Sequence, residues 1–290
     1  MPGPVVHQHR HTDTLARMGA AWVGRWLGRR ARRHLDDGLP QLAHFGFEHV
    51  GRAVTVWGSY ERDEHELLRD ALQARGLLTA HGLCLDIGAN IGNHAMFFAP
   101  LYREVWAFEP NPRTFTLLQL NAQLAPNVRC FNLGLSDVAG IATLSVPAHN
   151  IGMATLQPGA PGVAVPCTLQ RLDDLPGLAA QCVALVKIDV EGHEPAALRG
   201  ALAMLRRDRP VVVFEQLPEE IDAQGSSPTM DVLRQAGYAQ WWTLETQRAG
   251  ASRWLNLLRR LCFGEVQRFV ECDCLARRFH TMVVALPGDR

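Results

Sequence analysis

The chain has 290 residues, of which 47% are hydrophobic and 20% charged, and its formal net charge is zero. This balance is typical of a globular protein with a sizeable core, and it excludes the strong positive field of many nucleic-acid-binding proteins. Seven scattered cysteines predict free thiols and a reducing, cytoplasmic setting. No apolar run is long enough to cross a bilayer, and the amino terminus has no signal-peptide core.

Residues 1–55 are predicted to form a tail and a basic amphipathic helix outside the main domain, which we assign to residues 56–290. Apolar residues recur at helical spacing over residues 14–35, and arginines gather toward the end of that stretch. Such a helix can lie peripherally on the inner face of an anionic membrane, or pack on protein, which we favour. The apolar residues are Leu15, Met18, Trp22, Trp26 and Leu27, and the arginines are Arg25, Arg29, Arg30, Arg32 and Arg33.

From residue 60 onward, strand-like and helix-like stretches alternate, which implies a mostly parallel, doubly wound α/β sheet. A helical insert is predicted around residues 251–263, within a segment at 245–275 that interrupts the pattern, and it offers a second region for membrane contact. The predicted helices are 61–75, 92–101, 112–124, 195–206 and 230–236. The predicted strands are 83–87, 104–108, 128–133, 141–146, 163–169, 184–189, 211–215, 238–244 and 281–286.

The most informative stretch is a strand that runs into a nucleotide-binding turn. Apolar residues 83–87 carry Asp86 near the strand end, and Gly88 and Gly92 bracket the turn into the next helix. Open α/β sheets bind ligands beyond the carboxyl ends of their strands, where glycine lets the backbone approach closely. A dinucleotide fingerprint needs a middle glycine, and this chain has Asn90 there. Asp86 also opposes a pyrophosphate, so the pattern disfavours NAD and favours a cationic nucleoside, S-adenosylmethionine.

Acidic residues close several successive strands. Glu109 follows the second strand, where an acid would hold ribose hydroxyls. Asp189 and Glu191 follow the buried strand at 184–188, and Glu215 ends the next one. Because parallel strands end at one edge of a sheet, these carboxylates are expected to line one rim, a feature typical of functional sites.

These motifs resemble the FkbM family of S-adenosylmethionine-dependent methyltransferases. The resemblance covers about residues 60–244 and implies the class I, Rossmann-like methyltransferase fold, with seven strands of which the last is antiparallel. It leaves out the amino-terminal helical extension and the insert at 245–275. The matching pieces are 86–92, 108–112, Asn121, 135–137, 171–174, 187–192, Glu194, Leu198, Gly200 and 213–215.

The resemblance also implies residue roles. The methionine half of S-adenosylmethionine is expected at residues 86–92, including Asp86, Gly88, Ala89, Asn90 and Gly92, and it also borders Asp189. The ribose is expected at Glu109 and Pro110, and the adenine beside Ser136 and Asp137. The acceptor, a hydroxyl of a glycan, glycolipid or secondary metabolite, is expected at a rim formed by Asp189, Glu191, His193 and Glu215, under a lid formed by the loop 147–162.

Several alternatives stay open at this stage. His193 or Glu191 is the candidate general base, since an alcohol must lose its proton as the O–CH₃ bond forms. Lys187, the only lysine, is expected to brace its turn electrostatically. A magnesium ion on Asp189, Glu191 and Glu215 is conceivable, but the spacing does not indicate a metal. A membrane- or complex-associated module without catalytic turnover is the alternative function.

Overall fold

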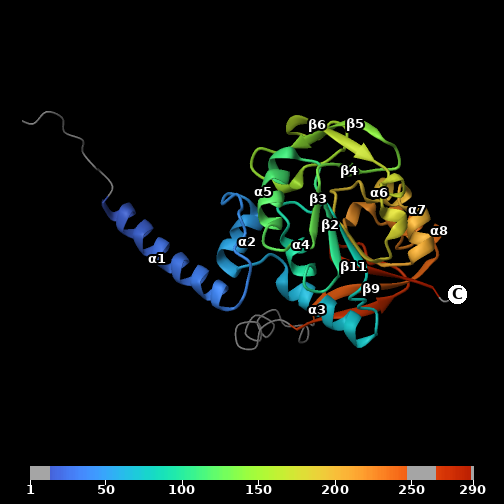
Figure 1. Cartoon of the computed structure of the whole chain (residues 1–290), viewed down its shortest axis with the longest axis horizontal. Helices are drawn as coiled ribbons and strands as arrows, with labels where there is room; N and C mark the ends of the chain where they lie inside the picture. Colours follow the sequence, from blue (N-terminus) through green and yellow to red (C-terminus); the bar gives the residue numbers. More distant parts are fainter. Residues whose placement is uncertain (1–13, 247–265, 289–290) are drawn as a thin grey trace, which may run out of the picture.

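The computed structural model describes residues 14–246 and 266–288, in which an eight-stranded sheet forms the centre of the molecule (Figure 1). The strands lie in the order β10-β9-β11-β8-β7-β1-β2-β3. This sheet comprises β1 (Leu83–Ile87), β2 (Glu104–Phe108), β3 (Val128–Phe131), β7 (Val183–Ile188), β8 (Val211–Gln216), β9 (Tyr238–Thr246), β10 (Gln267–Cys272) and β11 (His280–Pro287).

The doubly wound α/β prediction is confirmed, including the antiparallel last strand. β1, β2, β3, β7 and β8 are parallel to one another, and β11 pairs antiparallel with β8 and β9. The sheet has eight strands rather than seven because β10 adds an edge strand to β9. β10 lies within the segment predicted as an insert at 245–275, where Phe269 and Val270 extend the pairing with β9. The helical insert predicted at 251–263 lies outside the described residues.

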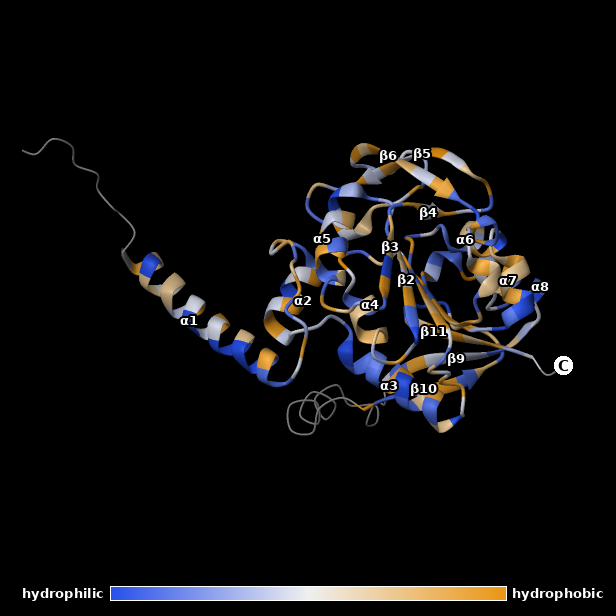
Figure 2. Ribbon diagram, viewed as in Figure 1, coloured by the Kyte–Doolittle hydropathy of each residue, from blue (hydrophilic) through white to orange (hydrophobic). Residues whose placement is uncertain are grey.

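Helices cover both faces of the sheet, and each face has its own hydrophobic core (Figures 1 and 2). One face packs against α3 (Arg62–Ala74), α4 (Asn93–Phe98) and α5 (Pro112–Ala122), and the other against α6 (Glu194–Arg199), α7 (Leu202–Asp208) and α8 (Pro228–Gln235). The remaining short helices are η1 (Ile151–Met153), η2 (Leu172–Asp174), η3 (Leu178–Ala180) and η4 (Pro218–Glu220).

Side chains alternate between the two faces of the sheet along β1, and this alternation determines the face toward which Asp86 points. Leu83, Leu85 and Ile87 belong to the core beneath α6, whereas Cys84 belongs to the core beneath α4. Since successive side chains of a strand point to opposite faces, Asp86 points toward the α3 and α4 side. The same alternation sends Lys187 of β7 and Glu215 of β8 to that side, with Leu185 and Val213 as their apolar neighbours on the same strands.

A second, three-stranded sheet accounts for the strand-like stretches predicted at 141–146 and 163–169. It has the order β4-β6-β5, with β4 (Gly134–Leu135), β5 (Gly140–Val146) and β6 (Val163–Gln170). A small apolar cluster lies beneath it, formed by residues such as Leu144, Ile151 and Leu169. The loop 147–162 therefore belongs to this second sheet, and Thr155 bridges back to Ser145 of β5.

The amino-terminal segment begins with the predicted helix, α1 (Thr14–Asp36), which projects away from the body of the molecule (Figure 1). Its last turns lie beside α2 (His49–Trp57), where the Arg30 guanidinium donates to the Val56 carbonyl at 2.7 Å. The first turns are exposed on all sides, with Leu15 83% exposed and Trp22 60% exposed. Among the described residues, no helix is long and apolar enough to span a membrane. The division of the chain at residue 55 stays a prediction.

Candidate functional site

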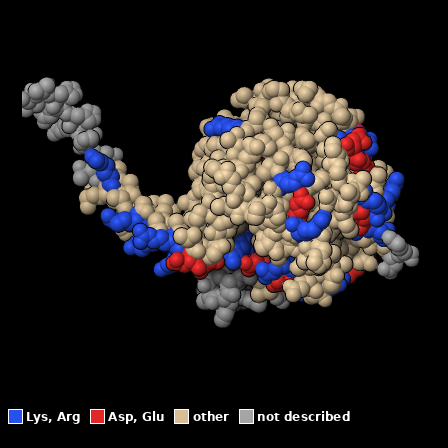
Figure 3. All heavy atoms as spheres, viewed as in Figure 1, with Lys and Arg blue, Asp and Glu red and all other residues tan. Residues whose placement is uncertain are grey.

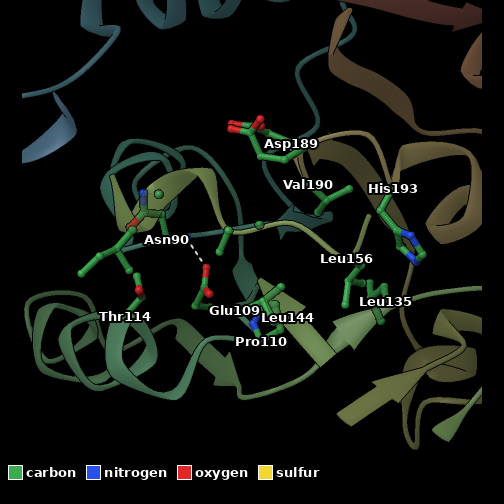
Figure 4. Close-up of a pocket in the computed structure, with 15 residues that line it drawn as sticks. Asn90, Glu109, Pro110, Thr114, Leu135, Leu144, Leu156, Asp189, Val190 and His193 are labelled. Carbon is green, nitrogen blue, oxygen red and sulfur yellow. Dashed lines mark hydrogen bonds between the residues drawn. The ribbon is translucent and has the colours of Figure 1, made fainter. Parts of the chain in front are cut away.

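A pocket of about 610 Å³ opens between the carboxyl ends of the central strands and the second sheet (Figure 4). This space is open to solvent on one side, and its lining combines apolar side chains with a few polar ones, as in many small-molecule sites. The apolar lining consists of Pro110, Leu135, Leu144, Ile151, Ala154, Leu156 and Val190. The remaining lining consists of Gly88, Asn90, Glu109, Thr114, Gly152, Asp189, Glu191 and His193.

The turn after β1 has the strained backbone that its glycines permit. Gly88 and Gly92 have φ values of 79° and 89°, and Asn90 has a φ of 50°. A Cβ at residue 88 would lie 1.8 Å from the Asp189 carbonyl oxygen, so this position accepts only glycine. Gly88 and Asn90 line the pocket, whereas Ala89 is buried in the turn and Gly92 packs beneath Leu118.

Glu109 is held at the pocket wall by two backbone donors. Its Oε2 accepts from the Asn90 N–H at 3.0 Å, drawn in Figure 4, and its Oε1 accepts from the Asn111 N–H at 2.8 Å. The side chain is buried, and burial raises its pKa to about 7 even though both bonds favour the carboxylate. A carboxylate oxygen accepts about two hydrogen bonds, so each oxygen retains acceptor capacity toward the pocket.

Two further polar atoms in the pocket lack a partner in the described part of the chain. They are the Asn90 side-chain oxygen and the Thr114 hydroxyl, both inaccessible to solvent. A buried polar group without a hydrogen bond costs free energy, so a side-chain rotation that turns these oxygens toward a ligand would be favourable. Thr114 was not identified from the sequence, because a threonine in the first turn of α5 looks like an ordinary helix residue. The sequence does carry one indication of its position. Asn111 caps α5 by accepting a hydrogen bond from the Arg113 N–H at 3.1 Å, which places Thr114 in the first turn of that helix, next to the carboxyl end of β2.

Asp86 lies behind the pocket rather than in its lining. It is fully buried, and within residues 14–246 and 266–288 neither of its carboxylate oxygens has a hydrogen-bond partner. Its nearest charge is Lys187, whose Nζ lies 3.6 Å from Asp86 Oδ1 and 3.6 Å from Asp189 Oδ2. Burial raises the pKa of Asp86, while Lys187 opposes that rise. Burial disfavours the charged lysine, but Asp189, Asp86 and other carboxylates together raise the pKa of Lys187.

Two more rim acids have strongly raised pKa values. Burial and the nearby Asp189 and Glu61 raise the pKa of Glu215 to about 9, so its side chain stays protonated at neutral pH. Glu215 does not line the pocket. Burial and Asp189 raise the pKa of Glu191 to about 7. Glu191 lines the pocket and has a φ of 54°, a strained backbone for a residue other than glycine.

His193 is positioned by a chain of polar contacts. Its Nε2 lies 3.0 Å from the Ser136 hydroxyl, which donates to Asp137 at 3.3 Å, and Arg199 donates to the same carboxylate at 2.8 Å. The Ser136 hydroxyl thus holds the imidazole through Nε2, and which of the two groups donates depends on the histidine tautomer. Burial lowers the pKa of His193. His193 lies at the start of α6 without capping it, and Ser136 and Asp137 support it from outside the lining.

The structure therefore brings together one group of predicted residues around the pocket and another group behind it. Gly88, Asn90, Glu109, Pro110, Asp189, Glu191 and His193 line the pocket, and Figure 4 shows Glu109 facing Asn90 with His193 at the far end. Asp86, Ala89, Gly92, Ser136, Asp137 and Glu215 do not line it. The predicted roles of all these residues remain predictions. The loop 147–162, predicted as a lid, contributes Ile151, Gly152, Ala154 and Leu156 to the lining.

Comparisons with known proteins agree with this arrangement. Residues 86–239 match the family described as the methyltransferase FkbM domain. The hexuronic acid methyltransferase AglP of Haloferax volcanii is 33% identical over 129 residues, which are 44% of this chain and 53% of the relative. The chain thus matches about half the length of this curated relative.

Solved structures with a similar arrangement are distant in sequence. A methyltransferase FkbM from Methylobacillus flagellatus is 14% identical, over 90% of this chain and 60% of that one, with a TM-score of 0.39. An O-methyltransferase from Bacillus cereus in complex with SAH is 13% identical, over 90% of each chain, with a TM-score of 0.40.

Proposed function

Because the chain belongs to the FkbM methyltransferase family, we propose that it transfers a methyl group from S-adenosylmethionine to a hydroxyl of a glycan, glycolipid or secondary metabolite. The observation that carries this proposal is the pairing of Glu109 with the Asn90 backbone beside the pocket. An acid at the end of β2, next to a glycine-bearing turn after β1, is the arrangement that grips a nucleoside.

The pocket residues fit this cofactor. Glu109 has acceptor capacity left for the two ribose hydroxyls, and Asn90 and Thr114 offer side-chain oxygens that lack a partner in the described chain. Apolar side chains such as Leu135 and Leu156 suit a flat base. When bound, the cofactor supplies an electrophilic methyl group on a sulfonium cation, and the acidic character of the rim suits that positive charge.

The residues available to remove the acceptor proton are Glu191 and His193, which both line the pocket. His193 would accept the proton on Nδ1, in the tautomer whose Nε2 donates to Ser136. Glu191, with its pKa raised to about 7, is partly ionised at neutral pH and is a stronger base than an ordinary carboxylate. A positioned base of either kind contributes roughly 10²–10⁴-fold to the rate.

We propose a neutral sugar hydroxyl rather than a carboxylate-bearing sugar as the acceptor. The relative AglP is described as a hexuronic acid methyltransferase. In this chain the charged side chains among the described lining residues are Glu109, Asp189 and Glu191, without lysine or arginine. A carboxylate acceptor would meet like charges there, because the Lys187 ammonium that faces Asp189 at 3.6 Å lies outside the lining.

The acidic rim does not fit a magnesium ion. Asp189 already faces the Lys187 ammonium at 3.6 Å, and Glu215 lies outside the pocket lining. Magnesium prefers ionised oxygen ligands in near-octahedral geometry, and Glu191 alone does not provide that. The proposed transfer therefore depends on Glu191 or His193 as base rather than on this metal.

The first turns of α1 do not pack on the described body of the protein, contrary to the packing that we favoured from the sequence, so we also propose that α1 contacts an anionic membrane surface. Its first turns expose Leu15, Met18 and Trp22, and its arginines are spread along the same projecting helix (Figure 3). Apolar and tryptophan side chains beside arginines suit the boundary between lipid headgroups and acyl chains. A glycolipid acceptor would be reached from such a position.

The proposed function is tested by binding and turnover with the full chain. Isothermal titration should detect S-adenosylhomocysteine binding, and Glu109→Gln should weaken it about 10- to 100-fold through loss of charge-assisted hydrogen bonds. Glu104→Gln, at the opposite end of β2, is the matched control. Methyl transfer from labelled S-adenosylmethionine is then measured on neutral and acidic sugars. A wild-type chain that binds neither form of the cofactor would refute the proposal, and binding without transfer to any hydroxyl would favour the module without turnover.

A further inference from the structure

A group of two histidines and one glutamate lies between α3 and α4, outside the pocket. Glu61, His65 and His94 each offer one potential metal-binding atom, and these atoms all lie within 4.8 Å of one another. His65 and His94 are buried and their rings stack at a centroid distance of 4.3 Å. Glu61 and His65 are separated by one helical turn, and His94 comes from the first turn of α4.

His94 supplies the independent sign that something is missing from this group. Its Nε2 is inaccessible to solvent and has no hydrogen-bond partner in the described chain. This nitrogen points toward the Glu61 carboxylate, with Oε2 at 3.4 Å. Two donor atoms bonded to one tetrahedral zinc ion are separated by roughly this distance, given metal–ligand bonds of about 2.0–2.2 Å.

The other two residues are prepared for the same role. His65 Nδ1 donates to the Glu61 carbonyl oxygen at 2.6 Å, which fixes the tautomer and leaves the Nε2 lone pair for a metal. Both imidazoles are buried, and the ring nitrogens that would bind a metal face the Glu61 carboxylate from two different helices. Glu61 has a φ of 54°, so the fold keeps this carboxylate at a backbone conformation that is costly for glutamate.

The charges around the group also favour a cation. Glu61, Asp86, Asp189 and Glu215 all act on the Lys187 ammonium, which is the only lysine of the chain. Burial is the main cause of the raised pKa values of Asp86 and Glu215, and the nearby Asp189 carboxylate adds to both, while the single ammonium of Lys187 only partly opposes the rise. A divalent cation near Glu61 would reduce this excess of negative charge.

We propose that Glu61, His65 and His94 bind a divalent first-row transition metal, with zinc as the first candidate. Two imidazoles and one carboxylate suit zinc, cobalt or nickel, and they suit magnesium poorly because magnesium prefers oxygen ligands. Three protein ligands leave one position of a tetrahedral ion for water. The ion would tie α3 to the turn that follows β1. This site is independent of the proposed methyl transfer.

The test measures metal content and uses cobalt as a spectroscopic probe. The amino-terminal His7, His9 and His11 would compete for metal, so all chains carry alanine at these three positions. Elemental analysis after zinc loading and desalting should find one zinc per chain, and cobalt loading should give a visible d–d band. His94→Gln should weaken binding at least 100-fold, since the loss of an outer-shell partner alone costs 10–100-fold. His280→Gln is the control, because His280 is another buried histidine with an unpartnered Nδ1, on β11.

A second measurement does not depend on whether the variants fold. Chelation of the loaded chain should lower its melting temperature, and added zinc should restore it, because a metal that binds only the folded state stabilises it. Equal zinc content in the His94→Gln variant and its parent would overturn the proposal. A melting temperature of the zinc-loaded chain that does not change when the chelator is added would also overturn it. S-adenosylhomocysteine binding is measured in parallel, so that a failure of the proposed function is recognised separately.

Discussion

The Nζ of Lys187 lies 3.6 Å from Asp86 Oδ1, and the two residues are directly paired in the register of β7 and β1. The only lysine of the chain thus neutralises a fully buried aspartate directly beneath the turn that borders the pocket. Its second contact, 3.6 Å to Asp189, links this buried charge to a residue of the pocket lining. Lys187 therefore stabilises the carboxyl ends of both β1 and β7 electrostatically, rather than its own turn alone.

Removal of this ammonium is expected to destabilise the fold strongly. Lys187→Met leaves Asp86 buried without a counter-charge, which typically costs about 3–5 kcal/mol. Because burial raises the pKa of Asp86, the variant keeps its stability at low pH and loses it as the pH rises through that raised value. Urea unfolding at pH 4 and pH 8 measures this difference. Arg69→Met, in an exposed pair with Asp70, is the control and should cost less than about 1 kcal/mol.

Glu215 is expected to make the protein less stable at high pH. Its folded-state pKa of about 9 lies far above the ordinary glutamate value of about 4.3, so its contribution falls as the pH rises between these values. Glu215→Gln removes the titration while keeping the shape. The variant should match the wild type near pH 4 and exceed its free energy of unfolding at pH 8, on the order of 1–3 kcal/mol. Equal pH dependence of the two chains would contradict this assignment.

Cofactor affinity is expected to depend on the ionisation of Glu109. If its carboxylate holds the ribose, affinity falls as the pH drops below its pKa of about 7. The Kd of S-adenosylhomocysteine should therefore be roughly tenfold higher at pH 6 than at pH 8. Titration calorimetry at both values measures the ratio, and Glu109→Gln should abolish the dependence. A ratio that persists in this variant would assign the titration to another group.

The acid limb of the kcat profile, measured at cofactor concentrations that saturate the site at every pH so that the titration of Glu109 does not enter, distinguishes the two candidate bases. His193 has its pKa lowered below the ordinary value of about 6.5, whereas Glu191 has its pKa raised to about 7. A limb with a midpoint below 6.5 therefore assigns the base to His193, and a midpoint near 7 assigns it to Glu191. Substitution of the true base, as His193→Ala or Glu191→Gln, should lower kcat about 10²–10⁴-fold. The other substitution should leave the midpoint in place.

Membrane contact through α1 is expected to depend on arginine charge. Each arginine near an anionic surface contributes about 1 kcal/mol, so replacing Arg25, Arg29 and Arg32 by alanine should weaken vesicle binding roughly 100-fold. Co-sedimentation with phosphatidylserine-containing vesicles measures this loss. Replacing Arg206, Arg207 and Arg234 of α7 and α8 is the matched control. Binding that is equal on zwitterionic vesicles, or unchanged by the α1 substitutions, would contradict the prediction.

Most helices and strands of the central sheet could be predicted from the sequence, because each has a periodic pattern of apolar residues. The strand at 83–87 and the helix at 61–75 appear nearly as expected, since alternation and amphipathicity are local properties. β10 was not predicted, because residues 267–272 were assigned to the insert at 245–275 on the basis of its helical periodicity. The pairing of β10 with β9 is also not a local property of the sequence. The pairing of the strands at 141–146 and 163–169 in a separate sheet was also not predictable locally.

The sequence motifs predicted which residues lie near the carboxyl ends of the central strands. They did not predict which of these side chains point into the pocket. Glu109 and Asn90 are joined by a hydrogen bond in the pocket wall, whereas Asp86 is withdrawn toward Lys187 by the alternation of β1. The contact between His193 and Ser136 joins residues 57 positions apart, and the Glu61–His94 pair joins two helices. Such contacts depend on tertiary packing, so no spacing in the sequence records them.

The hydrogen bonds of Asn121 in α5 bear on how far the chain can be shortened from its amino-terminal side. Its side chain bonds both backbone groups of Ala43, at 2.7 Å and 2.9 Å, and also the Ile91 carbonyl in the turn after β1. Through Asn121, the irregular segment that contains Ala43 is therefore linked to the turn that borders the pocket, although this segment lies outside residues 86–239. A shortened chain that begins at residue 56 would lose both bonds to Ala43 and leave the Asn121 amide only partly hydrogen-bonded, so we expect the shortening to loosen the turn after β1 before it disturbs the hydrophobic core.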